Sequence, residues 1–190
     1  MNSVTLARNT ARALLRSEAI ILDTETTGLG DDAEICEIAI IRAEDGAVLL
    51  NSLVRPSIPN GAEHINGITA EMLATAPTWA EIVVRVWAQV ENKPILAYGA
   101  DFDARMLLQT TLRALFPPEQ EPAFIYLFHW RCVMQMFMNW SGTSRRISLR
   151  DAAWRCDIQP GTHRALSDCI ATRGVLLAMA GMEGGNDGDE

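Results

Sequence analysis

Two carboxylates stand two residues apart at the end of an apolar run. The run Ile20-Ile21-Leu22 predicts a buried strand, and Asp23 and Glu25 follow it. Because side chains on a strand alternate between its two faces, these acids are expected to project side by side. Two like charges this close repel unless a proton or a cation lies between them, and paired carboxylate oxygens suit Mg²⁺ or Mn²⁺. A solvated pair of acids at a strand end is the competing interpretation, since D-x-E is a common pattern.

A third acid follows a second buried strand. The segment 94–98 predicts a short strand, and the chain then reads G-A-D-F-D from Gly99 to Asp103 as it turns into a helix. Asp101 is a plausible N-cap, which places Asp103 in the first helical turn. Central strands of an α/β sheet end at one edge, so Asp103 can approach Asp23 if their strands are neighbours. The alternative is an acid that complements the helix dipole.

A histidine and a fourth acid stand near the end of the chain. They belong to the run H-R-A-L-S-D, from His163 to Asp168. We expect Gly161 to loosen the loop that carries His163. Asp168 has mostly apolar neighbours at helical spacing, so it needs a partner if it faces inward. Taken alone, such a histidine is usually a capping or surface residue, and such an acid is usually solvated.

The elements that must position these residues follow from hydrophobic periodicity and from turn residues. An amphipathic helix at 4–16 precedes an antiparallel meander of three strands, after which strands alternate with helices. This order predicts an α/β fold, a mixed sheet with helices on both faces. One domain over residues 1–180 is expected, with the N-terminal helix (1–17) packed on it and a disordered acidic tail at 181–190. The expected strands are 20–22, 35–41, 48–54, 94–98 and 123–128; the later helices begin at 69 and then span 77–90, 101–116, 131–140, 148–156 and 163–179, and 56–66 is a loop.

Composition indicates an ordinary globular protein of 190 residues, 48% hydrophobic and 21% charged. The net charge of −8 argues at first against a nucleic-acid partner. Four of these charges lie in the tail, however, and two divalent cations would cancel the four candidate ligands. Positive charge is almost all arginine, with Lys93 the single lysine, and arginine suits bidentate phosphate contacts.

The remaining sequence features indicate the cell compartment of the protein. No apolar run is long enough to span a membrane, and the first residues lack the apolar core of a signal peptide. The cysteines lack C-x-x-C spacing, so we expect reduced thiols in a cytoplasmic protein. They are Cys36, Cys132, Cys156 and Cys169.

Three motifs in this order carry a resemblance. D-T-E-T-T-G-L at 23–29, F-D at 102–103 and H-R-A-L-S-D at 163–168 resemble the DEDDh family of 3′→5′ exonucleases. The resemblance implies a ribonuclease-H-like fold, two divalent cations (Mg²⁺ or Mn²⁺) and His163 as the general base. It implies four metal ligands, which are Asp23, Glu25, Asp103 and Asp168. It also implies a pocket for the 3′-terminal nucleotide, formed by Thr26, Thr27, Gly28 and Leu29 together with Phe102.

Two departures from the family pattern put substrate contacts in doubt, not the chemistry. Gly99 stands where the family often has Asn, and Asn66 stands where it often has His in an H-G-I-T element. His64 is a weak candidate to replace that histidine.

The prediction is therefore a metal-dependent exonuclease acting on the 3′ end of single-stranded nucleic acid, with DNA favoured. Two cations about 3.5–4 Å apart can activate water and neutralise the charge that develops on the phosphate, and a histidine titrates near neutrality. Three alternatives stay open: a proofreading or accessory subunit that mainly binds a polymerase or helicase, an exoribonuclease, and a binding module without turnover. A homodimer is also expected if the segment 131–140, which is apolar nearly all round, buries only one face in its own core.

Overall fold

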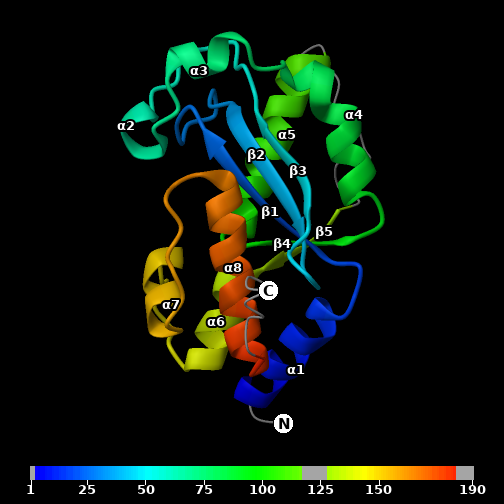
Figure 1. Ribbon diagram of the computed structural model, residues 1–190, viewed down its shortest axis with the longest axis vertical. Coiled ribbons are helices and arrows are strands. Elements are labelled where there is room, and N and C mark those ends of the chain that lie inside the picture. The colour runs from blue at the N-terminus through cyan, green and yellow to red at the C-terminus, as the bar shows by residue number, and fades with distance from the viewer. Residues whose placement is uncertain (1–2, 117–127, 183–190) are drawn as a thin grey trace, which may run out of the picture.

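A five-stranded sheet with helices against both faces forms the centre of the computed structural model, which describes residues 3–116 and 128–182 (Figure 1). The strands are β1 (Ile20–Thr26), β2 (Ile35–Arg42), β3 (Val48–Leu53), β4 (Pro94–Ala97) and β5 (His129–Cys132). The helices are α1 (Ser3–Leu15), α2 (Glu63–Asn66), α3 (Ala70–Ala74), α4 (Trp79–Val90), α5 (Ala100–Leu115), α6 (Val133–Ser141), α7 (Leu149–Arg155) and α8 (Ala165–Ala180).

The strand order β3-β2-β1-β4-β5 places β1 in the middle of the sheet. β1, β2 and β3 form an antiparallel meander, and Ile20 pairs with Arg42 across the first turn. β4 then runs parallel to β1, with Leu96 beside Ile21, and β5 runs parallel to β4. This mixed sheet confirms the predicted α/β class, and it brings the carboxyl ends of β1 and β4 to one edge.

The residues of β1 alternate between two hydrophobic cores. Ile21 packs with residues of α1, α6, α7 and α8 on one face of the sheet. Ile20 and Leu22 pack with α4 and α5 on the other face. Each such side chain contributes about 1.5–3 kcal/mol when it is removed from water, so burial on both faces fixes the register of the strand that carries Asp23 and Glu25.

Two predicted segments differ from the structure, and a third lies almost wholly outside the described residues. The strand expected at 123–128 lies outside the described residues except for Phe128, which belongs to no strand, and residues 131–132 belong to β5 rather than to a helix. Arg131 pairs with Leu96, so pairing with β4 overrides the helical pattern until Val133. The expected loop at 56–66 contains the one-turn helix α2, which ends at Gly67 in the left-handed region (φ +67°).

The apolar residues of α6 pack inside the domain. Val133 and Phe137 are fully buried, and Met136 and Trp140 also pack against the core that α6 shares with α1 and α8. The second apolar face that suggested a homodimer is thus covered by the chain's own helices. The oligomeric state stays a prediction, which light scattering would test.

Other expectations concern the chain as a whole. Within the described ranges no helix combines the length and the apolar composition needed to cross a bilayer. All four cysteines are free thiols. The predicted tail begins at Gly181, where α8 ends in a left-handed cap (φ +65°), and residues 183–190 lie outside the described residues. The limits of the single domain stay predictions.

Candidate active site

β1 places Asp23 and Glu25 on the face of the sheet that α8 covers. Both acids lie within the strand, which runs to Thr26, rather than just beyond its end as the sequence suggested. Glu25 pairs with Glu37 of β2 across the antiparallel ladder. Directly opposed residues share a face, so this end of the sheet carries a third carboxylate that the motifs do not include.

Asp103 reaches the same strand from α5. It is 4% exposed, and its Oδ1 accepts hydrogen bonds from the backbone N–H of Thr24 at 3.1 Å and from Thr24 Oγ1 at 2.9 Å. These bonds hold one oxygen of Asp103 against the residue between Asp23 and Glu25. The N-cap of α5 is Gly99, so Asp101, which was expected to be the N-cap, lies in the first turn and is exposed.

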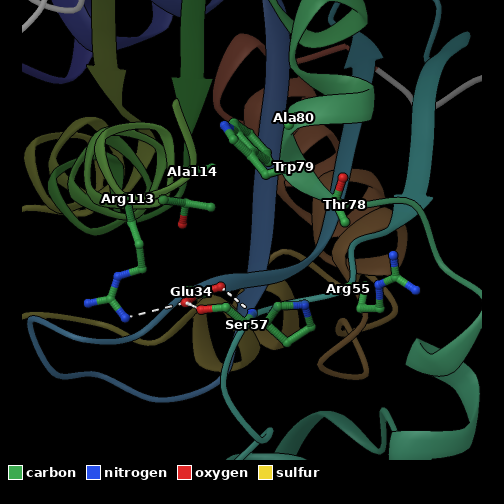
Figure 2. Close-up of a pocket in the computed structure, with 10 residues that line it drawn as sticks. Glu34, Arg55, Ser57, Thr78, Trp79, Ala80, Arg113 and Ala114 are labelled. Carbon is green, nitrogen blue, oxygen red and sulfur yellow. Dashed lines mark hydrogen bonds and ion pairs between the residues drawn. The ribbon is translucent and has the colours of Figure 1, made fainter. Parts of the chain in front are cut away.

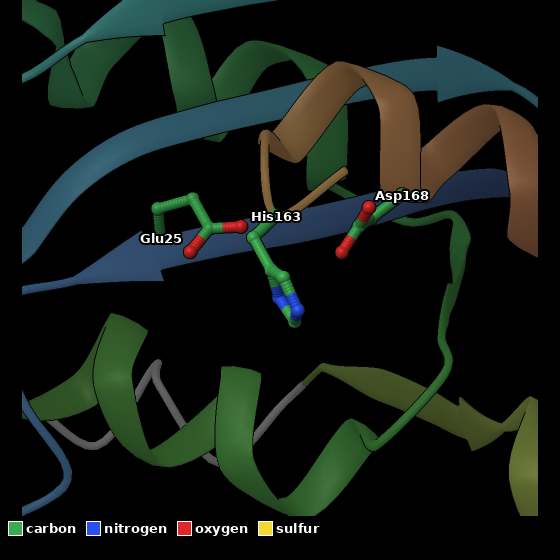
Figure 3. A group of neighbouring side chains, drawn as sticks. All are labelled: Glu25, His163 and Asp168. Atoms are coloured by element: carbon green, nitrogen blue, oxygen red, sulfur yellow. The ribbon is translucent and has the colours of Figure 1, made fainter. Parts of the chain in front are cut away.

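Glu25, His163 and Asp168 form a cluster of possible metal ligands. One ligand atom from each lies within 4.8 Å of the other two. Figure 3 shows the carboxylates of Glu25 and Asp168 directed toward each other, with the imidazole of His163 beside the space between them. Among the described residues Asp23 and Asp103 are outside this group of three, although Asp103 raises the pKa of Glu25, and Asp168 and Glu25 raise the pKa of Asp23.

Burial and mutual repulsion raise the pKa of all four carboxyl groups. For Asp23 burial raises the pKa well above its usual range, and Asp103 and Asp168 raise it further. For Glu25 burial and then Asp168 raise the pKa to about 8. Burial also raises the pKa of Asp103, against the hydrogen bonds from Thr24, and that of Asp168, against the charge of His163. Without a cation, four adjacent carboxylates cannot all be ionised near neutral pH.

The donor set fits a divalent cation. Oδ1 of Asp168 is buried and has no hydrogen-bond partner among the described residues. A buried carboxylate oxygen without a donor is costly, and a hard cation is the ligand that such oxygens prefer. The residues that would hold it are Asp23, Glu25, Asp103 and Asp168.

His163 lies in the loop before α8, not in the helix as the sequence predicted, because α8 begins at Ala165. Its backbone is left-handed (φ +57°), an uncommon conformation for a residue with a side chain. The next residue, Arg164, binds Glu37 with two hydrogen bonds, Nε to Oε2 at 3.0 Å and Nη2 to Oε1 at 2.6 Å. The backbone N–H of Ala165 also donates to Glu37 Oε2 at 2.9 Å. Glu37 therefore fixes the two residues that follow His163.

Glu37 is one residue of the site that sequence reasoning missed. It is 4% exposed in a strand whose other members from Ile35 to Ile41 are apolar. A single acid in such a run needs a partner when it is buried, and this signal was present in the sequence. The identity of the partner, Arg164, was not.

Gly161 has a different role from the one expected. A Cβ atom built on Gly161 would lie 1.8 Å from Oδ1 and 3.2 Å from Cα of Asp168. The backbone of the His163 loop thus passes directly against the carboxylate of Asp168, where a side chain cannot fit. Gly161 permits this close approach, and the expected loosening of the loop stays a prediction.

The threonines after Asp23 hold the turn that ends β1. Thr26 Oγ1 donates to the Gly28 carbonyl at 2.7 Å, and Thr27 Oγ1 accepts the backbone N–H of Glu34 at 3.0 Å. Both threonines are buried. Their hydroxyls are already hydrogen-bonded within the protein. The two threonines would therefore contribute to the predicted nucleotide pocket through its shape.

Leu29 and Phe102 are the predicted pocket residues whose side chains remain accessible to a ligand. Leu29 is 77% exposed, and Phe102 is partly buried at the start of α5. Arg105 joins them, because its guanidinium lies 5.4 Å from the centre of the Phe102 ring and its Nη2 donates to the Leu29 carbonyl at 3.2 Å. Arg105 was missed in the sequence, although Phe102 and Arg105 have the i, i+3 spacing that makes helical neighbours.

The two departures from the family pattern have distinct environments. Asn66 is buried; its Nδ2 donates to the Thr26 carbonyl at 3.2 Å, and its Oδ1 accepts the backbone N–H of Ile68 at 3.0 Å. Asn66 therefore ties the α2 segment to the end of β1. Gly99 has open space where a Cβ would be. His64 is exposed on α2 and does not take the place of Asn66.

A pocket of about 420 Å³ lies next to the turn, but it contains none of the predicted catalytic residues. Figure 2 shows Ser57 and Arg113 converging on Glu34, which is 6% exposed. Glu34 accepts the backbone N–H of Ser57 at 2.7 Å and pairs with Arg113 Nη1 at 3.3 Å. Because the backbone N–H of Glu34 binds Thr27, these contacts support the turn from behind.

Comparison with protein families gives a match over most of the chain. The family model described as exonuclease matches residues 20–176. An uncharacterised exonuclease of Escherichia phage 186 is 38% identical over 182 residues, which is 90% of this chain and 92% of the phage protein. A PolC-type DNA polymerase III of Thermotoga petrophila is 30% identical over 169 residues, and there the chain spans only 12% of the polymerase.

Solved structures with the same fold are also nucleases. Exonuclease X in complex with 5′ overhanging duplex DNA has a TM-score of 0.63 and 25% identity, over 86% of this chain and 91% of that one. The nuclease domain of 3′hExo, a DEDDh family member bound to rAMP, has a TM-score of 0.64 over 84% of this chain and 90% of that one. At 17% identity the second likeness shows the fold alone.

Proposed function

This chain belongs to the exonuclease family, and from that premise we propose that it removes nucleotides one at a time from the 3′ end of single-stranded nucleic acid, with DNA as the favoured substrate. The observation that carries the proposal is the convergence of Glu25, His163 and Asp168 within 4.8 Å at the end of β1. Asp103, which is buried, and Asp23, which is partly buried, add two carboxyl groups to the same site. The whole set is what metal-dependent phosphodiester hydrolysis requires.

The four carboxylates would hold two divalent cations, Mg²⁺ or Mn²⁺. When bound, such cations supply positive charge that stabilises the charge developing on the phosphate and on the leaving oxygen. Thr24 holds Asp103 in place through two hydrogen bonds. Burial disfavours the ionised form of these carboxyl groups, and a bound cation would favour it again.

His163 would accept a proton from the attacking water. The imidazole must be neutral to do so, and an imidazole titrates close to neutral pH. Two features of the chain aim it: the contact of its loop with Asp168 at Gly161, and the hold of Glu37 on Arg164 and Ala165. His163 needs no large movement to reach the space between Glu25 and Asp168.

The 3′-terminal nucleotide would lie against Leu29 and Phe102. The turn from Thr26 to Gly28 is closed by its own hydrogen bonds and backed by Asn66. We infer that such a closed turn encloses a chain end and excludes a strand that would continue past it. This supports attack at an end rather than within the strand.

Two alternatives are kept beside this proposal. The PolC-type relative, in which this domain is a small part, supports a proofreading role beside a polymerase. The 3′hExo nuclease domain, a likeness of fold alone, was solved with rAMP, so RNA is tested beside DNA for the exoribonuclease alternative. The expected cytoplasmic location also remains a proposal.

Digestion of matched end-labelled substrates separates these functions. Linear single-stranded DNA, duplex DNA, RNA and a circular single strand are incubated with Mg²⁺ or with EDTA. We expect stepwise loss from the 3′ end of linear single strands, no cutting of circles and no activity in EDTA. Asp103→Asn should abolish turnover, whereas Asp101→Asn, an exposed acid on the same helix, should not. Efficient cutting of circles would exclude an exonuclease.

A further inference from the structure

A strongly basic surface lies outside the candidate active site, on α7 and the segment before it. Four arginines stand between residues 145 and 155, with Asp151 as the single acid, which gives this stretch a charge of 4 − 1 = +3 in a chain of net charge −8. Together with Trp154 we call them the α7 basic face. Its arginines are Arg145, Arg146, Arg150 and Arg155.

The arginines of this face are exposed and carry no ion pair. In the described parts of the chain, arginine ion pairs are made by Arg42, Arg105, Arg113 and Arg164, and by none of the four on the α7 basic face. An acidic protein offers many carboxylates as partners, yet these guanidinium groups face solvent. A cluster of unpaired arginines repels itself and attracts a polyanion.

Trp154 stands among these arginines with 79% of its surface exposed. The buried side of α7 is formed by Ala152 and Ala153, so Trp154 does not belong to the core. Arg150 and Trp154 are four residues apart and share one side of the helix. An exposed aromatic ring between arginines is the combination that binds single-stranded nucleic acid, because phosphates pair with the cations and an unpaired base stacks on the ring.

The face borders the candidate active site. Tyr98 Oη donates to the carbonyls of Ile147 at 2.9 Å and Ser148 at 3.1 Å, which holds the start of α7 against the end of β4. From its other end the chain runs directly into the loop that carries His163. Figure 1 shows α7 beside α8, with this loop rising from α7 to the start of α8.

We propose that the α7 basic face binds the substrate strand on the 5′ side of the nucleotide being removed. The arginines would contact its phosphates and Trp154 would stack on one unpaired base, without regard to sequence. The inference rests on the proposed exonuclease function and extends it: the terminal nucleotide is held at Leu29 and Phe102, and the strand behind it is held on α7. A single strand fits better than a duplex, since stacking on Trp154 requires an unpaired base.

The test compares a long single-stranded oligonucleotide with a dinucleotide. Arg145, Arg146 and Arg150 are replaced by Gln together, and the control replaces Arg8, Arg16 and Arg85, three exposed arginines on other surfaces, in the same way. Turnover of both substrates is measured with Mg²⁺. Binding of a labelled oligonucleotide, as DNA and as RNA, is measured by fluorescence anisotropy in EDTA at several salt concentrations.

We expect the triple variant to raise KM for the long oligonucleotide about tenfold and to leave the dinucleotide unaffected. Each lost phosphate contact lowers the slope of log affinity against log salt by about 0.7 for a single strand, so the slope should fall by about 2. Trp154→Ala should weaken binding of the long oligonucleotide about tenfold, and Trp154→Phe should restore most of it. The control triple should behave like the parent.

Unchanged binding and salt slope in the triple variant would overturn the proposal, and so would an equal loss in the triple variant and in the charge-matched control. Loss of dinucleotide turnover in the triple variant would also overturn it, since that outcome indicates general damage. The anisotropy measurement does not depend on catalysis. If the parent binds the oligonucleotide through this face but cuts no substrate, the exonuclease proposal fails while the binding surface stands.

Discussion

Arg164 and Glu37 form a pair of parallel hydrogen bonds, at 3.0 and 2.6 Å, between residues 127 positions apart in the sequence. Glu37 is directly opposite Glu25, and Arg164 directly follows His163. This single pair therefore joins β2, the strand next to the one that carries Glu25, to the loop that carries the proposed base. It acts as a positioning contact, because neither residue is among the groups proposed to act on the substrate.

Loss of this pair should reduce turnover more than substrate binding. Glu37→Gln keeps an acceptor for Ala165 but loses the charge that holds Arg164, and kcat should fall about 10–100-fold with little change in KM, as for other residues that orient metal-site groups. Arg164→Ala should do the same and lower the melting temperature, since it leaves Glu37 buried without its cation. Arg164→Lys should recover part of kcat. A lower melting temperature with parental kcat would show a purely structural role.

His163→Ala should lower kcat about 10²–10⁴-fold, the usual contribution of a general base. Metal and substrate binding should change little. The matched control is His64→Ala, which removes an exposed histidine on α2 and should be neutral. Parental turnover in His163→Ala would refute the assignment.

The metal-free protein should become less stable as the pH rises from about 5 to about 8. The pKa of Glu25 is about 8 in the folded protein against 4.5 as its ordinary value, so in this window the folded state holds a proton that the unfolded state has lost. That contribution to stability is lost as the pH rises through the folded pKa. Asp23, Asp103 and Asp168 shift in the same direction.

Melting temperatures measured across this pH range, in EDTA and in Mg²⁺, test this coupling between protonation and stability. In Mg²⁺ the melting temperature should fall less with rising pH than it does in EDTA. Binding of Mg²⁺ near neutral pH should also release protons, which calorimetry in buffers of different ionisation enthalpy detects. Glu25→Gln should make the EDTA curve less steep. Stability that rises with pH in EDTA would contradict the prediction.

Gly161→Ala should impair catalysis by moving the His163 loop. The added Cβ would lie 1.8 Å from Oδ1 of Asp168, so either the loop or the carboxylate must shift. We expect weaker Mg²⁺ activation and a kcat lower by at least tenfold, in line with other changes around metal ligands. Gly99→Ala is the control, because nothing lies within 4 Å of its added Cβ. Equal activity of the two variants would show that the close approach is unimportant.

The sequence predicted the parts of this protein that depend on local pattern. The apolar run at Ile20 identified the central strand, and the three motifs identified Asp23, Glu25, Asp103, His163 and Asp168 as candidates. The Glu37–Arg164 pair and the contact of Gly161 with Asp168 depend on how distant segments pack, and local periodicity does not report that. Residues 131–132 were predicted as helix for the same reason, since their pairing with β4 depends on segments distant in the sequence.

The two ends of α8 lie in different parts of the molecule, one at the candidate active site and the other away from it. Its first turn borders the candidate site, and its last turn is held by α1, where Arg12 Nε donates to the Ala180 carbonyl at 2.6 Å. Sixteen helical residues separate these two ends by about 24 Å. A linker attached near Ser3 or Met182 would therefore leave the nuclease face open, so the protein can be tethered to a bead or a sensor surface and still receive a strand end from solution.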